Sequence, residues 1–182
     1  MRVLLFGEAP GPLGADKSGI PFWGDRAGLV VYRALEATGL AQIPKEAFAN
    51  WDGASLKAKG LIPILKGVAL SNAYPSCPTR DGQTFKAPTD RELASVENLA
   101  RIGRELTQAT SRCPGRLRVI ALGKRAAWLF QKMEDAPSFD LVTLPHPSAQ
   151  GLLQAAPGKG KGLRLADLQA AWERRLQELL SS

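Results

Sequence analysis

Four short apolar segments alternate with helical patterns, and this alternation is the feature that most constrains the fold of the chain. The segments cover residues 2–6, Val68–Asn72, Leu117–Leu122 and Phe139–Leu144. Apolar runs of this length, bounded by turn residues, are typical of strands buried in a parallel sheet. Strands that alternate with helices predict an α/β fold, here a three-layer α/β/α sandwich around a four-stranded, mainly parallel sheet.

Helices are expected between and after these strands, at residues 26–38, from 89 to about 106, after Gly123, and at about 165–180. Thr89 and Glu92 have the spacing of a capping box, which marks a helix start. Five apolar residues then follow at helical spacing and predict one continuous apolar stripe. They are Leu93, Val96, Leu99, Ile102 and Leu106.

Length and charge limit the classes of protein to which the chain can belong. A chain of 182 residues with 45% hydrophobic residues is sufficient for one well-buried domain, so we expect a single domain at 1–182. The 24 Lys and Arg residues exceed the 17 Asp and Glu residues, and the net charge of +7 favours a polyanionic partner. No apolar run approaches the length of a membrane span, so we expect a cytoplasmic protein.

The chain contains only two cysteines and one histidine. This excludes a disulfide scaffold and a zinc or iron-sulfur site built from four Cys and His ligands of this chain. We therefore expect no metal and no cofactor, and we interpret Cys77 and Cys113 as structural thiols. If the single histidine, His146, has a chemical role, it acts without a second imidazole.

Ligands of parallel α/β sheets bind beyond the carboxyl ends of the strands. The informative segments are therefore 7–22, 72–77, 123–125 and 145–148. The Gly/Pro-rich loop after the first strand matches neither the phosphate-binding loop nor the dinucleotide-binding motif. Taken alone, this loop is consistent with an ordinary strand-to-helix connection.

The strand ends together carry a family resemblance. The motifs are Gly7-Glu8-Ala9-Pro10-Gly11, Gly19-Ile20-Pro21-Phe22, Asn72 after the second strand, Val119-Ile120-Ala121-Leu122-Gly123, and His146-Pro147-Ser148. In this order they resemble the uracil-DNA glycosylase superfamily, and most closely its iron-sulfur class of bacteria and archaea. That class uses four cysteines, beginning with a pair before the first motif, so the cluster is expected to be absent here.

The resemblance implies a DNA base-excision repair enzyme that flips a damaged base out of the duplex. Phe22 would stack on the flipped base. Asn72 would read uracil, because its amide accepts from N3–H and donates to O4, whereas cytosine reverses both groups. His146 would donate to O2 as negative charge develops on the leaving base. Glu8 or Asp16 would stabilise the positively charged sugar.

Other positions of the motifs contribute to the expected substrate site. Gly7 brings the backbone close to the base, and Gly11 lies where some relatives place a bulky residue against the pyrimidine C5 position. Ala9 stands where the most active glycosylases have a water-activating Asp. Ser148 would hold a phosphate at a helix start.

The resemblance also implies contacts with DNA. Leu152 or Leu153 would enter the minor groove and fill the gap left by the flipped base. Basic side chains near the site would contact phosphates. These are Lys17, Lys124, Arg125, Lys159 and Lys161.

The sequence thus predicts a monomeric, cofactor-free hydrolase, a monofunctional uracil-DNA glycosylase that is associated with the nucleoid and acts on single- or double-stranded DNA. Two alternatives remain at this stage. One is a catalytically weak or inactive DNA-binding protein of the same fold, which the Ala9 position favours. The other is a small-nucleotide-processing enzyme that uses the loop after the first strand.

Overall fold

The computed structural model describes residues 2–81, 84–133 and 136–181. The chain divides into two compact units. The first contains residues up to 12 and 67–144, and the second contains residues 13–66 and 145–182. The expectation of one domain over 1–182 stays a prediction.

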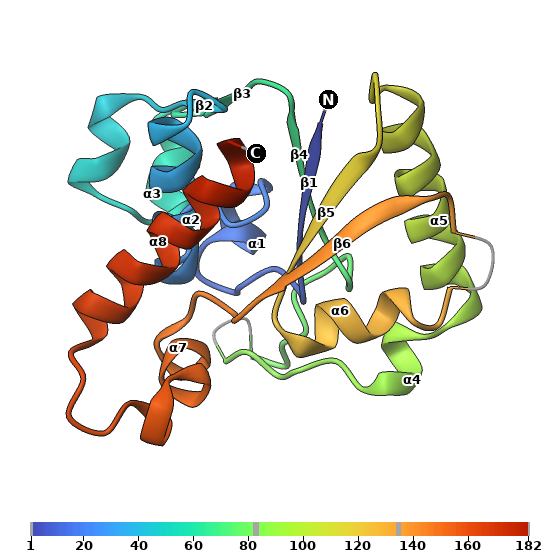
Figure 1. Ribbon diagram of the computed structural model, residues 1–182. Helices are drawn as coiled ribbons and strands as arrows, with labels where there is room; N and C mark the ends of the chain where they lie inside the picture. The colour runs from blue at the N-terminus through green and yellow to red at the C-terminus, as the bar shows by residue number, and fades with distance from the viewer. Residues whose placement is uncertain (1, 82–83, 134–135, 182) are drawn as a thin grey trace. The chain divides into compact units, whose positions relative to one another are not determined.

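The first unit is built on a four-stranded sheet (Figure 1). Its strands are β1 (Val3–Gly7), β4 (Val68–Asn72), β5 (Leu117–Leu122) and β6 (Phe139–Leu144), in the order β4-β1-β5-β6. All three pairings are parallel, so the predicted α/β fold class is confirmed. The four predicted strands are present, and β1 extends to Gly7, which lies in register with Asn72.

Helices α4 (Asp90–Leu93), α5 (Val96–Ser111) and α6 (Lys124–Phe130) belong to the same unit. Apolar side chains of α5 and α6, including Ile102, Leu106 and Leu129, share one core cluster with Phe6 and Val119 of the sheet. Burying each such side chain contributes about 1.5–3 kcal/mol, so this cluster provides much of the stability of the unit. It also supports the ends of β1 and β4, where Glu8 and Asn72 lie.

The single helix predicted from 89 to about 106 is wrong, because α4 and α5 are separate. The capping box of Thr89 and Glu92 is present and starts α4. The chain then leaves the helix at Ala94, and the Ser95 hydroxyl accepts from the backbone N–H of Asn98 and starts α5. Because α5 starts anew at Val96, the apolar residues before and after the break do not share one helix face. Val96, which was expected to face inward, is 79% exposed.

The second unit is mostly helical. It contains α1 (Ala15–Ser18), α2 (Arg26–Ala37), α3 (Gly53–Ala58), α7 (Ala149–Ala155) and α8 (Leu165–Ser181), with short 3-10 helices at Lys45–Ala49 and Pro157–Gly160. The predicted helices at 26–38 and 165–180 are confirmed as α2 and α8, which pack together. Strands β2 (Ala41–Gln42) and β3 (Ile64–Leu65) form a small antiparallel pair that the sequence did not indicate.

Helix α8 also anchors the segment that carries the histidine. The indole N–H of Trp172, a buried residue of α8, donates to the carbonyl of Pro145 at 2.8 Å. Among the described residues, no helix combines the length and apolarity needed to cross a membrane.

Candidate functional site

Asn72 ends strand β4 with its amide buried. The residue is 6% exposed, and its side-chain oxygen Oδ1 has no hydrogen-bond partner in the part of the chain that the structure describes. Leaving a buried acceptor unsatisfied costs about 1–3 kcal/mol, and such groups in native proteins call for an explanation. The Asn72 amide oxygen is therefore suited to accept a hydrogen bond from a ligand.

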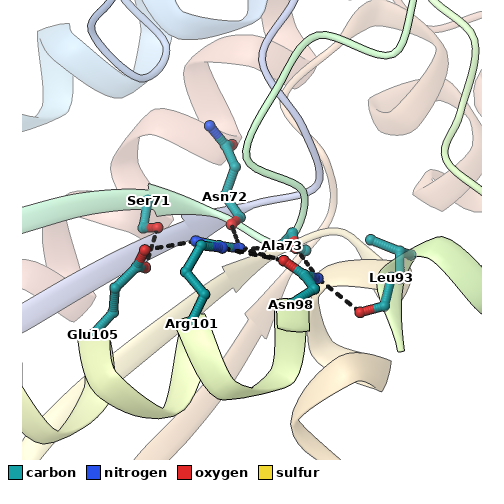
Figure 2. Close-up of polar contacts among 7 residues, drawn as sticks. All are labelled: Ser71, Asn72, Ala73, Leu93, Asn98, Arg101 and Glu105. Carbon is teal, nitrogen blue, oxygen red and sulfur yellow. Dashed lines mark hydrogen bonds and ion pairs between the residues drawn. The ribbon is translucent and has the colours of Figure 1, made fainter. Parts of the chain in front are cut away.

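The backbone on both sides of Asn72 is held firmly. The N–H of Ala73 donates to the carbonyl of Gly7 at 2.8 Å, and the N–H of Tyr74 donates to the carbonyl of Glu8 at 2.8 Å. The guanidinium of Arg101 in α5 donates to the carbonyl of Asn72 at 2.9 Å. Figure 2 shows the side-chain amide of Asn72 pointing away from this guanidinium.

Glu8 follows β1 and is held by a cation. Arg125 of α6 donates to Glu8 Oε1 at 2.9 Å, to Asp90 Oδ1 at 2.8 Å and to the carbonyl of Pro88 at 2.6 Å. The sequence predicts Arg125 as a phosphate contact, but its guanidinium is occupied by three acceptors of the chain. We therefore reassign Arg125 to the support of Glu8. Sequence spacing does not reveal this role, because residues 8 and 125 are far apart in the chain and become neighbours only when β1 pairs with β5.

The loop after Glu8 contains three of the predicted site positions. Gly7 is buried at the end of β1, whereas Ala9 and Gly11 are half-buried. The methyl group of Ala9 supplies neither an acid nor a base. Glu8 is therefore the carboxylate of this segment.

In the second unit, Phe22 has a strained backbone. Its φ of 63° lies in the left-handed region, which costs a residue with a side chain about 1–3 kcal/mol. The phenyl ring is mostly covered, since Phe22 is 7% exposed. Strain of this kind persists only where the surroundings hold the chain, and it is concentrated at functional sites.

Three aromatic residues hold the loop of Phe22. Tyr32 Oη donates to the carbonyl of Pro21 at 3.0 Å, and Trp51 Nε1 donates to the carbonyl of Asp25 at 2.8 Å. Trp23 lies edge-on to both rings, with centroid distances of 4.7 Å. Burial raises the pKa of the Tyr32 hydroxyl, so it remains a neutral donor at all ordinary pH values.

His146 lies two residues beyond β6, and its ring has a defined tautomer. The backbone N–H of Ser148 donates to His146 Nδ1 at 3.2 Å. A nitrogen that accepts a hydrogen bond carries no proton, so the proton of the neutral ring is on Nε2. Burial lowers the pKa of His146 below its usual 6.5, which keeps the imidazole neutral near pH 7. The ring therefore offers one N–H donor, at Nε2.

Two glycines near helix starts, Gly28 of α2 and Gly151 of α7, allow the chain to approach the candidate residues closely. A Cβ on Gly28 would lie 1.7 Å from the carbonyl oxygen of Phe22. A Cβ on Gly151 would lie 2.4 Å from the carbonyl oxygen of His146. Sequence reasoning missed both residues, although a glycine inside a helical pattern is a signal of close packing.

The close approach at Gly151 gives a stability prediction. Gly151→Ala is expected to lower the free energy of unfolding by about 1–3 kcal/mol, because the new methyl group overlaps the backbone of His146. Gly103→Ala is the matched control, since a Cβ there meets only Met133 Cε at 3.9 Å. Gly103→Ala should raise the free energy of unfolding by about 0.5–1 kcal/mol, because alanine is favoured over glycine within a helix. Urea denaturation measures both, and equal stability of Gly151→Ala and the parent would contradict the prediction.

The residues after His146 form helix α7. Ser148 is its N-cap, with its hydroxyl oxygen accepting from the N–H of Gly151 at 3.1 Å. The hydroxyl oxygen caps the helix as an acceptor, and its predicted contact with a phosphate, through the O–H, stays a prediction. Leu152 is 5% exposed and faces inward, which corrects its prediction as a groove-filling side chain. Leu153 is half-buried and stays a candidate.

The remaining charged candidates lie on exposed segments. Asp16 and Lys17 in α1 form an ion pair of 3.3 Å, so Asp16 is a surface carboxylate and less suited than Glu8 to a site. Lys124, Lys159 and Lys161 are exposed. Their ammonium groups are therefore available to an anionic partner.

The cysteines do not fit an iron-sulfur cluster. Cys77 and Cys113 are both free and half-buried, and the chain has no others. A cluster of this kind requires four thiolates, or two with two imidazoles. Among the described residues, no group of three or more Cys, His, Asp or Glu side chains is placed to hold a metal ion.

Comparisons with known proteins identify the family. The family model described as "Uracil DNA glycosylase superfamily" matches residues 1–174. The chain is similar to a type-5 uracil-DNA glycosylase of Thermus thermophilus, with 46% identity over 92 residues. This match covers 50% of the chain and 35% of the relative, so the chain spans about a third of the length of that curated protein.

Proposed function

Because the chain belongs to the uracil-DNA glycosylase superfamily, we propose that it hydrolyses the N-glycosidic bond of uracil, or of a related deaminated base, in DNA. The observation that carries this proposal is the buried amide of Asn72, whose Oδ1 has no partner among the described residues. Uracil is a ligand that supplies the missing donor, through N3–H. The Asn72 NH2 group then donates to uracil O4.

The Asn72 amide discriminates against cytosine. Cytosine presents an acceptor at N3 and a donor at N4. The Asn72 oxygen would then face another acceptor, and the Asn72 NH2 group would face another donor. Mismatched polar groups in a buried site cost about 1–3 kcal/mol each. Thymine differs only at C5, where Gly11 offers no side chain. Substituted pyrimidines are therefore within the proposed substrate range.

His146 stabilises the leaving group in this proposal. When the glycosidic bond breaks, its electron pair moves to N1 of the base, and negative charge spreads to O2. The Nε2–H of the neutral ring donates to that oxygen, and the hydrogen bond strengthens as the charge grows. This role is supported by the hydrogen bond from the backbone N–H of Ser148 to Nδ1, which places the proton of the neutral ring on Nε2.

Glu8 acts on the sugar. Loss of the base leaves positive charge near C1′, and a negative carboxylate stabilises it. The oxygen of a water molecule then forms the new bond to C1′, and the proton that this water loses is taken up by the uracil anion, which leaves as neutral uracil. Arg125 orients Glu8 but also offsets part of its charge. Since Ala9 supplies no base for the water, we expect slow chemistry.

The proposal also includes base flipping. Phe22 stays the predicted stacking residue, and base–aromatic stacking contributes about 1–3 kcal/mol. Because the residue is only 7% exposed, stacking requires the base to reach the uncovered edge of the ring or the loop of Phe22 to move. Leu153 is the candidate for the space that the base leaves in the duplex. Lys17, Lys124, Lys159 and Lys161 contribute phosphate contacts and make affinity dependent on salt.

The function is tested with oligonucleotides that contain one uracil, hypoxanthine, thymine or cytosine, in single and double strands. The protein, in excess, is incubated with each, and alkali then cleaves any abasic site. Uracil excision with cytosine left intact supports the proposal. Salt-sensitive binding with no scission of any strand would instead establish the alternative of an inactive DNA-binding protein, which Ala9 favours.

The reassignment of Arg125 is tested against its neighbour on α6. Arg125→Met should lower the single-turnover rate about tenfold, because Glu8 loses the group that orients it, while the salt dependence of DNA binding is retained. Lys124→Met should instead reduce the slope of log affinity against log salt by about one. Reduction of the slope by the Arg125 variant, with an unchanged rate, would restore the phosphate-contact interpretation.

A further inference from the structure

A polar network joins helix α5 to the end of strand β4 (Figure 2). At its centre is Arg101, whose Nη2 donates to the carbonyl of Asn72 at 2.9 Å and to that of Ala73 at 3.1 Å. Its Nη1 forms an ion pair with Glu105 Oε1 at 2.6 Å. Glu105 Oε2 accepts from the hydroxyl of Ser71 at 2.6 Å. The network therefore holds residues 71, 72 and 73 in succession.

Asn98 completes the network from inside the protein. This buried asparagine donates through Nδ2 to the carbonyls of Ala73 and Leu93, each at 2.7 Å. Its Oδ1 accepts from Arg101 Nε at 3.1 Å and Nη2 at 2.9 Å. Both the oxygen and the nitrogen of the Asn98 amide thus form hydrogen bonds, whereas Oδ1 of Asn72 has no partner within the described part of the chain. The two buried asparagines of this unit have different roles, one structural and one open to a ligand.

We propose that Arg101 is the positioning residue for base recognition, acting through Asn72. This inference rests on the proposed function, in which the Asn72 amide reads uracil. Arg101 holds the Asn72 carbonyl on the α5 side, and parallel pairing with Gly7 holds the strand on the β1 side. The backbone is held from both sides, and the side-chain amide points away from α5 (Figure 2).

The chemistry of the guanidinium explains why an arginine occupies this position. Its planar fork reaches two carbonyls, a carboxylate and an amide oxygen together. A lysine ammonium is a single point charge with three donors on a flexible stem, and it does not reproduce this pattern. Arg101→Lys should therefore keep the charge yet loosen the strand end.

The test requires a variant that removes the fork without leaving a buried charge. Arg101→Met combined with Glu105→Met removes both partners of the ion pair, and such paired replacements are often neutral in stability. Arg104→Met is the matched control. Arg104 is exposed on the same helix and lines the same cavity of about 600 Å³ as Arg101, but in the described part of the chain it makes no hydrogen bond or ion pair with residues 71–73. Thermal unfolding confirms that each variant folds.

The readout is one that a loss of stability does not change. Free uracil and 3-methyluracil, which lacks N3–H, are compared as inhibitors of uracil excision. The parent should favour uracil at least tenfold, and the double methionine variant and Arg101→Lys should lose most of this preference. Arg104→Met should retain it. In an Asn72→Ala background, the methionine pair should cause no further loss of excision rate, since Arg101 acts through Asn72.

The outcomes separate this inference from the proposed function. If the parent excises no uracil, the proposed function fails. If the parent excises uracil but the folded methionine variant retains the full preference over 3-methyluracil, the positioning role of Arg101 is overturned. Additive losses in the Asn72→Ala background would overturn it as well, because they would show that Arg101 acts independently of Asn72.

Discussion

Asn72→Ala is expected to lower uracil excision about 10²- to 10³-fold and to leave the free energy of unfolding within about 1 kcal/mol of the parent. Activity falls because the hydrogen bonds to N3–H and O4 of the base are lost. Stability is retained because Oδ1 of Asn72 has no partner among the described residues, so its removal breaks no bond of that atom. Single-turnover kinetics and urea denaturation measure the two effects.

Thr110→Ala provides the matched control for Asn72. The hydroxyl of Thr110, in α5, is the other buried side-chain atom without a partner within the residues described. Its removal should leave both stability and excision near the parent values. If Asn72→Ala lost several kcal/mol of stability while Thr110→Ala lost none, the amide of Asn72 would have a structural role and the assignment to base recognition would fail.

His146→Ala should lower the excision rate by about 10²-fold or more, the typical effect of removing one donor to a developing anion. His146→Gln should recover part of the rate, because an amide N–H can donate to the same oxygen. Since burial lowers the pKa of His146 below 6.5, the neutral ring is already present at pH 7. The rate of the parent should therefore be constant from pH 7 to pH 8 and fall only in acid.

The same histidine predicts a pH dependence of stability. The native state resists protonation of His146, whereas the unfolded chain binds that proton near pH 6.5. The neutral ring therefore contributes fully to the free energy of unfolding above pH 6.5. This contribution is lost as the pH falls through the lowered pKa of His146 in the native state. His146→Gln should reduce this acid sensitivity. An identical pH dependence in the variant and the parent would show that the ring is not held neutral by burial.

Much of the fold could be predicted from the sequence, because short apolar strands and capped helices are local signals. The four strands of the sheet and the capping box at Thr89 are examples. The break before α5 was missed, since Ser95 competes with helix continuation by accepting a backbone N–H. The small β2-β3 pair was also missed, because two-residue strands leave no periodic pattern.

The candidate site was predicted unevenly. Short motifs indicate Glu8, Phe22, Asn72 and His146 as candidates, because each lies in a segment with its own sequence signature, and their roles stay predictions. Their supports were not identified, because Arg101 and Arg125 contact residues 29 and 117 positions away. The charge of Arg125 alone suggests a phosphate contact. Its three acceptors, visible only in the structure, assign it to Glu8.

The sequence by itself determined the parallel α/β fold, the family and the identity of the chemical groups at the strand ends, since these depend on local pattern and residue type. The tertiary structure decided the state of each group: an Asn72 oxygen with no partner among the residues that the structure describes, a proton on Nε2 of His146 and a cation beside Glu8. Hydrogen-bond partners and burial set these states, and both depend on residues that are distant along the chain and adjacent only after folding.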